Sequence, residues 1–154
     1  YLCSKFTKKR FKTISRKIMI SFNYETDFKL ENESVLSNWI TNVIASEGFK
    51  LEEINYVFCD DDYLHKLNVE FLNHDTLTDI ISFDYSVGKL IQGDIFISIE
   101  RVEDNAKDFH VTFNKELQRV IVHGVLHYCG YKDKTDDNAK LMRQKENHYL
   151  AVLG

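Results

Sequence analysis

Short runs of β-branched and aromatic residues alternate along this chain with longer stretches in which apolar residues recur every three or four positions. The short runs have the length and composition of β-strands, and the longer stretches have the period of helices that bury one face. Because both kinds of segment follow one another along one chain, the pattern predicts an α+β fold in which helices pack on one mixed sheet. We expect about four strands, at 18–24, 54–59, 80–83 and 93–99.

The longer stretches predict five helices, and glycine marks the end of two of them. Gly48 and Gly130 follow the last apolar positions of their helices, where glycine commonly ends a helix. The expected helices begin at Glu33 and at the acidic triplet 60–62, and cover 100–108, 114–129 and Thr135–Leu150. The side chains expected to point inward from the second and last of these helices are Leu64, Leu67, Phe71, Leu141, Met142, Tyr149 and Leu150.

The composition is that of an ordinary globular protein. With 154 residues the chain suits one domain with a buried core, and its 44% hydrophobic residues exclude a disordered protein. No apolar run is long enough to span a membrane, so we expect no membrane partner. Three scattered cysteines indicate free thiols in a reducing cytoplasm. Cys129 is expected to be a small buried residue.

Charge is distributed unevenly along the chain. Residues 1–18 carry seven Lys or Arg and no acid, whereas 19–154 carry the remaining 13 of the 20 basic residues and all 24 acidic ones. A basic arm can bind nucleic acid. However, Met19 is the first methionine and opens the first strand pattern, so we expect a non-native or disordered basic leader at 1–18 and one domain at 19–154. Because that domain is acidic, any contact with RNA must be local.

Two histidines, His123 and His127, are four residues apart in the predicted helix 114–129. At this spacing their side chains leave the same face of the helix, about 5–6 Å apart, so both rings can bind one metal ion. Gly130 can turn the chain back, and Asp133 follows with a carboxylate. Two imidazoles and one carboxylate leave a fourth position for water, as a catalytic zinc site requires. The alternative is that the histidines are ordinary residues of a polar helix face.

The histidine spacing is also that of zinc metalloproteases, in which a glutamate follows the first histidine and acts as general base. Here Gly124 occupies that position. A zincin-like protease would therefore lack its proton acceptor, and this alternative is disfavoured.

Three segments together resemble the YbeY-type metal-dependent endoribonucleases, which take part in maturing bacterial ribosomal RNA. They are HGVLHYCGYKD (123–133), LNVEFLNHDTLTDIISF (67–83) and GDI (93–95). The helical motif of that family is similar to His-Gly-x-Leu-His-x-x-Gly-Tyr-Asp-His, and its three histidines bind a metal ion that is usually taken as zinc. The resemblance implies that His123 and His127 are two ligands of one zinc ion in a metallohydrolase-like domain.

The chain departs from the family pattern at two positions. Asp133 occupies the position of the third family histidine, so the expected ligand set is two histidines and one aspartate. The charge of the aspartate should leave metal-bound water less acidic than three neutral imidazoles would. The family arginine that is thought to help cleave RNA falls on Leu72. Lys132 and Lys134, which flank Asp133, are candidates to replace that positive charge; the alternative is that both are solvated loop residues.

The leading hypothesis is a zinc-dependent endoribonuclease that hydrolyses single-stranded RNA in ribosomal RNA processing in the cytoplasm. His123 and His127 would act through metal-bound hydroxide, with no separate general base identified. The motifs shared with the family suggest residues that line the substrate cleft or orient the ligands: Asn68, His74, Asp75, Asp79 and Ser82. Of these, Asn68, Asp75 and Asp79 suit helix or turn capping equally well.

The main alternative is a non-catalytic ribosome-assembly factor in which the metal serves the structure. The missing arginine favours this role, and the acidic domain would suit a basic ribosomal protein as partner. Cleavage of RNA with and without a chelator distinguishes the two hypotheses.

Overall fold

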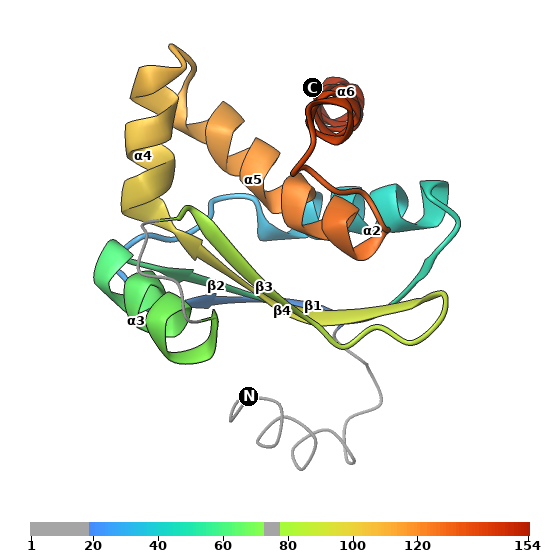
Figure 1. Cartoon of the computed structure of the whole chain (residues 1–154), viewed down its shortest axis with the longest axis horizontal. Helices are drawn as coiled ribbons and strands as arrows, with labels where there is room; N and C mark the ends of the chain where they lie inside the picture. Colours follow the sequence, from blue (N-terminus) through green and yellow to red (C-terminus); the bar gives the residue numbers. More distant parts are fainter. Residues whose placement is uncertain (1–18, 73–77) are drawn as a thin grey trace.

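The computed structural model describes residues 19–72 and 78–154. The predicted leader at 1–18 and two candidate cleft residues, His74 and Asp75, lie outside the described residues. No helix within the described ranges combines the length and the apolar character needed to cross a membrane. The elements are β1 (Ile20–Tyr24), α2 (Glu33–Ser46), β2 (Lys50–Cys59), α3 (Asp61–Leu72), β3 (Ile80–Asp84), β4 (Leu90–Ser98), α4 (Ile99–Asp108), α5 (Phe113–Tyr128) and α6 (Asp136–Leu153) (Figure 1).

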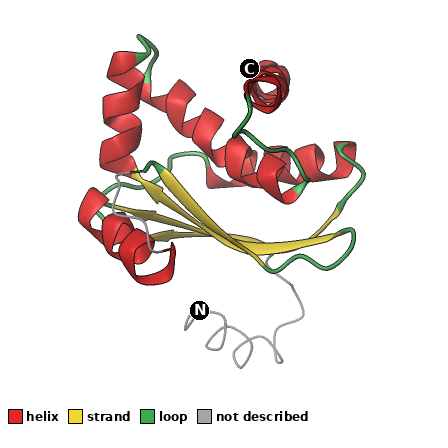
Figure 2. Cartoon of the chain, viewed as in Figure 1, coloured by secondary structure: helices red, strands yellow, loops and turns green. Residues whose placement is uncertain are grey.

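The strands of the described residues form one sheet in the order β1-β2-β4-β3. β1 and β4 run parallel to β2, whereas β3 runs antiparallel to β4. Figures 1 and 2 show α2, α4, α5 and α6 over one face of this sheet and α3 over the other. The prediction of an α+β fold with a mixed, four-stranded sheet is confirmed.

The long apolar run in β4 is explained by its position between two cores. Ile91, Ile95 and Ile97 belong to the larger core, which α2 and α5 cover, and Phe96 belongs to the smaller core under α3. Because successive side chains of a strand point to opposite faces, a strand covered on both sides is apolar at nearly every position. β4 therefore supports helices on both faces of the sheet.

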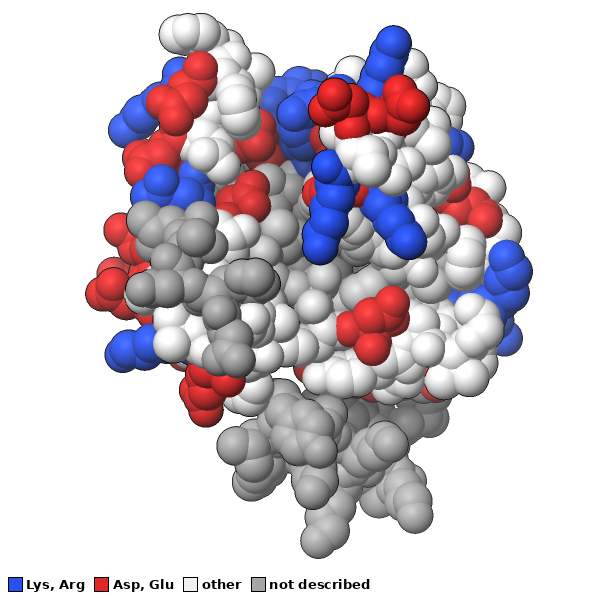
Figure 3. Space-filling view, viewed as in Figure 1, with Lys and Arg blue, Asp and Glu red and all other residues white. Residues whose placement is uncertain are grey.

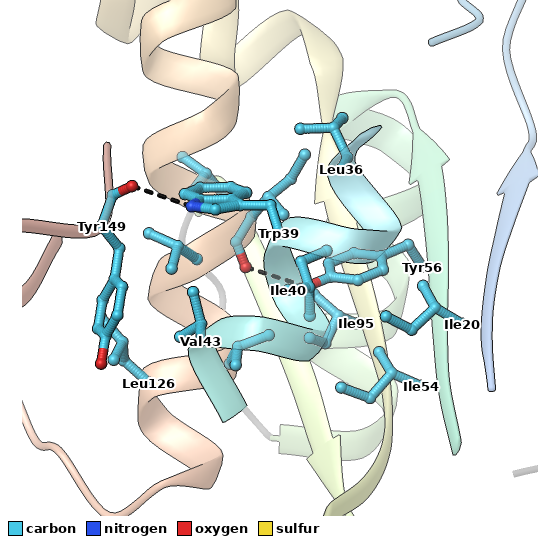
Figure 4. Packing of buried hydrophobic residues seen from close by; sticks show 14 of the residues in the cluster. Ile20, Leu36, Trp39, Ile40, Val43, Ile54, Tyr56, Ile95, Leu126 and Tyr149 are labelled. Carbon is cyan, nitrogen blue, oxygen red and sulfur yellow. Dashed lines mark hydrogen bonds between the residues drawn. The ribbon is translucent and has the colours of Figure 1, made fainter. Parts of the chain in front are cut away.

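Two buried hydrogen bonds hold α5 and α6 in place over the sheet (Figure 4). The hydroxyl of Tyr56 on β2 donates to the carbonyl oxygen of Ile121 on α5 at 3.0 Å. The indole N–H of Trp39 on α2 donates to the carbonyl oxygen of Tyr149 on α6 at 2.9 Å. Buried polar groups need such partners, so these bonds also fix the positions of the helices that they join.

Two residues that were predicted to lie in the core are exposed. Phe71 is 48% exposed and Leu141 is 44% exposed. On α3 the buried stripe is narrow, and Phe71 lies at its border with its ring edge-on to Phe83, the centroids 6.0 Å apart. Leu141 lies one residue, or about 100° of helical rotation, from Met142, the first residue of the buried stripe of α6. That stripe consists of Met142, Glu146, Tyr149 and Leu150.

β2 and β4 both begin earlier than the sequence pattern predicts. β2 starts at Lys50, and Leu51 is buried, but two consecutive acidic residues, Glu52 and Glu53, interrupt the apolar alternation. The pairing of β2 with β4 shifts between Leu51 and Glu53, and this irregularity accommodates the interruption. Periodicity alone therefore did not predict where these two strands begin.

Candidate metal centre

The C-terminal half of α5 and the loop after it bring together three side chains that could hold a metal ion. His123 and His127 lie one turn apart, and their Nε2 atoms are 2.9 Å from one another. Oδ2 of Asp133 lies 3.2 Å from Nε2 of His123 and 3.3 Å from Nε2 of His127. Ligand atoms about 2.0–2.2 Å from one tetrahedral ion are about 3.3–3.5 Å apart. The triangle is therefore close to the size that a single small metal ion requires.

A glycine positions the third member of this group. Gly130 adopts a left-handed backbone conformation with φ of 99°, which costs glycine no steric clash. Its N–H donates to the carbonyl oxygen of His127 at 3.0 Å, and the N–H of Tyr131 donates to that of Leu126 at 3.1 Å. The helix therefore ends here, as predicted, and the chain turns back so that Asp133 reaches the two histidines.

Hydrogen bonds define which nitrogen of each ring carries a proton. Nδ1 of His127 lies 2.9 Å from the carbonyl oxygen of Tyr131, which can only accept, so Nδ1 is the donor. Nδ1 of His123 donates to Oε2 of Glu146 at 2.7 Å. In the neutral rings both Nε2 atoms then present lone pairs, and these face one another beside the carboxylate of Asp133. Such lone pairs repel unless a cation lies between them, so the donor set fits a metal ion.

Glu146 on α6 was not identified from the sequence. Its side chain is buried, with the residue 4% exposed, and Oε1 contacts Arg119 at 3.1 Å and Arg143 at 3.7 Å. Burial by itself would raise the pKa of Glu146, but the hydrogen bond and charge of His123, together with the arginines, lower it. Burial likewise would lower the pKa of His123, but Glu146 outweighs this effect and raises it. Glu146 therefore remains ionised and orients the ring of His123.

Replacing Glu146 with glutamine should weaken metal binding about 10- to 100-fold, because an amide orients the imidazole of His123 less strongly than a carboxylate does. Competition titration with a chromogenic chelator measures this affinity. Glu103→Gln, on the exposed face of α4, is the matched control and should leave the affinity unchanged. Equal affinity in the two variants would contradict the orienting role of Glu146.

Known proteins are similar to this chain over most of its length. A family model described as "Endoribonuclease YbeY" matches residues 19–154. The Endoribonuclease YbeY of Flavobacterium johnsoniae is 66% identical over 135 residues, which cover 88% of this chain and 97% of that protein. This chain belongs to the YbeY endoribonuclease family. The corresponding protein of Christiangramia forsetii is 52% identical over 134 residues, covering 87% of this chain and 94% of the relative.

The fold of a solved structure is also similar. The solution structure of a Thermotoga maritima protein matches with a TM-score of 0.62 and 27% sequence identity, covering 87% of this chain and 88% of that chain. The fold of this domain is therefore also found in a solved protein whose sequence has diverged to 27% identity.

Removing the metal from this YbeY family member should lower its melting temperature by about 5–10 °C. An ion that binds the folded chain at 100 times its dissociation constant stabilises it by about 2.7 kcal/mol, and each kcal/mol shifts the melting temperature of a domain this size by about 2–4 °C. Thermal unfolding before and after chelation, and again with excess zinc, measures the shift. Identical melting curves in all three conditions would contradict metal binding by the folded domain.

A cleft of about 360 Å³ opens beside the metal-binding group. In Figure 1, α5 lies between α4 and α6, and residues of all three helices line the cleft. Figure 3 shows the surface hollowed between α4 and α6, with Lys and Arg side chains at the rim of the hollow. The residues that line it include Asp79, Asn105, Phe109, Arg119, His123, Asp133, Arg143 and Glu146. Two members of the candidate metal-binding group of this YbeY family member, His123 and Asp133, therefore face this cleft.

Of the remaining residues that the sequence suggested for the cleft, one lines it and two do not. Asp79 lines it, and burial raises the pKa of its carboxyl group, which accepts a hydrogen bond from Asn105 at 3.4 Å. Ser82 on β3 is partly buried and alternates with Ile81 so that it shares the α5 side of the sheet. It is not among the residues that line the cleft. Asn68 is buried on α3, which covers the opposite face of the sheet.

The two lysines proposed to replace the family arginine lie in the loop between α5 and α6. Lys132 and Lys134 are exposed on either side of Asp133. Neither is among the residues that line the cleft, whereas Arg119 and Arg143 are. These two arginines are functional candidates that were not identified from the sequence. Arg143 projects from α6, and only the packing of α6 against α5 brings it into the cleft that His123 lines.

Gly124, which occupies the position of the glutamate in the zinc protease motif, faces the sheet. A Cβ atom at Gly124 would lie 3.0 Å from Cδ1 of Ile80 and 3.1 Å from Cδ1 of Ile95. A glutamate at this position would thus point into the core, away from the Nε2 atoms of the two histidines. The geometry argues against the protease alternative.

Proposed function

We propose that this protein is a zinc-dependent endoribonuclease that hydrolyses single-stranded RNA. The observation that supports this most strongly is the convergence of three possible ligand atoms, since Nε2 of His123, Nε2 of His127 and Oδ2 of Asp133 lie within 3.3 Å of one another. A nitrogen-rich set of three ligands with an open fourth position is typical of catalytic zinc. When bound, the ion would supply Lewis acidity and a water molecule of lowered pKa.

The protein's own groups prepare this site. Glu146 and the carbonyl oxygen of Tyr131 hold the protons of His123 and His127 on Nδ1, so that both Nε2 atoms stay available as ligands. Asp133 adds a negative charge from an exposed loop. His123, His127 and Asp133 would hold the ion, and the two histidines would act on RNA only through the Lewis acidity and the activated water that it would supply.

Ribosomal RNA in the cytoplasm is the substrate that the resemblance to the YbeY family implies. The open cleft suits a polymer rather than a small molecule, since a strand can pass through it between α4 and α6. The acidic composition of 19–154 restricts RNA to this cleft instead of a broad basic surface. Single-stranded RNA fits this requirement better than a duplex because a lone strand can bend into the hollow.

The test is cleavage of RNA by the purified full chain. We expect an unstructured RNA to be cut, the activity to disappear on chelation, and stoichiometric zinc to restore it, while a duplex of the same sequence remains intact. Metal analysis should find one ion per chain. Cleavage that persists after complete removal of metal would overturn the proposal.

A second candidate is a ribosome-assembly factor in which the metal stabilises the fold. The observation that favours it is Leu72, an apolar residue at the end of α3 where the family is expected to have an arginine. A basic ribosomal protein would be its partner. Loss of thermal stability on chelation, combined with no cleavage of any RNA by the zinc-loaded protein, would favour this candidate.

A further inference from the structure

Two side chains in the cleft have no part in holding the metal. Arg119 lies on α5, one turn before His123, and Phe109 follows the last residue of α4 on the facing wall. One is a cation and the other is an aromatic ring, which are the two kinds of group that bind single-stranded nucleic acids.

One side of the Arg119 guanidinium is hydrogen-bonded within the protein, and the other side is open to solvent. Its Nη1 donates to Oε1 of Glu146 at 3.1 Å and to Oδ1 of Asn147 at 3.0 Å. The side chain is 21% exposed, and no buried side-chain nitrogen or oxygen in the described ranges lacks a partner. The Nε and Nη2 groups, which have no acceptor among those residues, are therefore open to solvent. A guanidinium anchored in this way presents a preorganised pair of donors to a phosphate.

Arg119 lies where it can contact the phosphate next to the scissile one, rather than the scissile phosphate itself. The carboxylate of Glu146 lies between Arg119 and the Nδ1 atom of His123, and the metal would lie beyond Nε2 of the same ring. Residues four apart on a helix are about 6 Å apart along its axis. A strand whose scissile phosphate lies at the metal, and which follows α5 toward its N-terminus, would thus bring its next phosphate toward Arg119.

Phe109 is 56% exposed, although it lines a cleft. Its ring has no aromatic partner within the part of the chain that the structure describes. His110, the next residue, has a left-handed φ of 56°, which turns the backbone away from α4 and leaves the phenyl ring at the cleft wall. An exposed ring at such a position can stack on a base that is not paired.

We propose that Arg119 and Phe109 form a subsite for the nucleotide next to the scissile phosphate, in which Arg119 binds its phosphate and Phe109 stacks on its base. The inference rests on the proposed cleavage of RNA and adds the residues that select single strands. A base in a duplex is already stacked and paired, so it cannot reach Phe109. Arg143, also in the cleft wall, adds positive charge beside the same phosphate.

Binding without cleavage tests the subsite separately from the reaction. In a His127→Ala background, which lacks one metal ligand, the affinity for a fluorescent unstructured RNA is measured by anisotropy over a range of salt concentrations. Arg119→Gln should weaken binding and reduce the slope of log affinity against log salt by about 0.7, as expected for one lost phosphate contact. Phe109→Ala should weaken binding about 5- to 100-fold, the range for one stacked base, and leave the slope unchanged.

Two variants outside the cleft serve as controls. Arg101→Gln removes a guanidinium that also pairs with a carboxylate, Asp61 at 3.0 Å, and Tyr63→Ala removes a partly exposed ring on α3. Neither should change RNA affinity beyond twofold. Effects as large as those of Arg119→Gln and Phe109→Ala would overturn the subsite, as would unchanged affinity in the two cleft variants.

A second measurement separates binding from a structural role of Arg119. In the zinc-loaded enzyme, Arg119→Gln and Phe109→Ala should raise KM for a long RNA with little change in kcat, and Arg119→Lys should recover part of the loss. An effect of Arg119→Gln on metal content alone, with normal RNA affinity, would show that Arg119 only supports Glu146 and would overturn the proposal. Wild-type protein that binds RNA through these residues but does not cut it would contradict the proposed function and leave the subsite standing.

Discussion

Replacing His127 with alanine should abolish both metal binding and RNA cleavage while the protein remains folded. Two ligand atoms, from His123 and Asp133, would remain, and a pair of ligands does not hold zinc in the tetrahedral geometry that it prefers. Because a catalytic metal contributes several kcal/mol to transition-state stabilisation, we expect cleavage to fall about 10³-fold or more. Metal analysis and a gel-based RNA cleavage assay on the same preparation measure the two losses together.

The matched control is His148→Ala, which removes an exposed histidine of α6 outside the metal-binding group. It should retain metal, cleavage and melting temperature. A His127→Ala protein that cuts RNA at the wild-type rate would show that the chemistry does not depend on this ion, whatever the metal content of the wild-type chain.

The Gly93→Ala substitution should destabilise the protein by about 2–6 kcal/mol. Gly93 lies on β4, where a Cβ atom would overlap the hydroxyl oxygen of Tyr128 and lie 2.6 Å from the carbonyl oxygen of Phe83. That hydroxyl donates to the carbonyl oxygens of Phe83 and Asp94, both at 3.0 Å. A methyl group would thus overpack the core, which typically costs about 1–3 kcal/mol. It would also break buried hydrogen bonds, which costs about 1–3 kcal/mol more.

Equilibrium denaturation by urea measures this loss, and Gly48→Ala provides the comparison. Gly48 has a positive φ of 83°, and a Cβ added there would meet no atom within 4 Å, so alanine at this position introduces backbone strain alone. That strain costs about 1–2 kcal/mol. If Gly93→Ala were no more destabilising than Gly48→Ala, the close approach of Tyr128 to β4 would be wrong.

The closeness of His123, His127 and Asp133 could be predicted from the sequence because the three residues lie within one short segment. Helical periodicity relates His123 to His127, and the glycine stop relates both to Asp133, so no long-range packing had to be known. Glu146 could not be placed in the same way, since its contact with His123 depends on how α6 packs against α5. A signal was nonetheless present: Glu146 interrupts an apolar helix stripe, and a carboxylate at a buried position needs a partner.

The fold could be predicted as far as its patterns were local. Composition identified the strands, but the acidic pair Glu52 and Glu53 concealed the start of β2. Phe71 and Leu141 were assigned to the core because an apolar side chain near a buried stripe resembles a member of it, and only the packing of neighbouring helices defines the border. The insertion of β4 between β2 and β3 is a matter of long-range pairing, on which periodicity gives no information.

All three candidate ligands lie within one short segment, and this affects the order in which contacts form during folding. Bringing together groups within an 11-residue segment, 123–133, loses little chain entropy, whereas the parallel pairing of β2 with β4 must close a much longer loop. A metal ion bound to this segment would therefore be held by local contacts that can form before the strands pair. The denatured chain would then keep part of its affinity for metal, and the stabilisation gained from the ion would be smaller than its affinity for the native state alone would give.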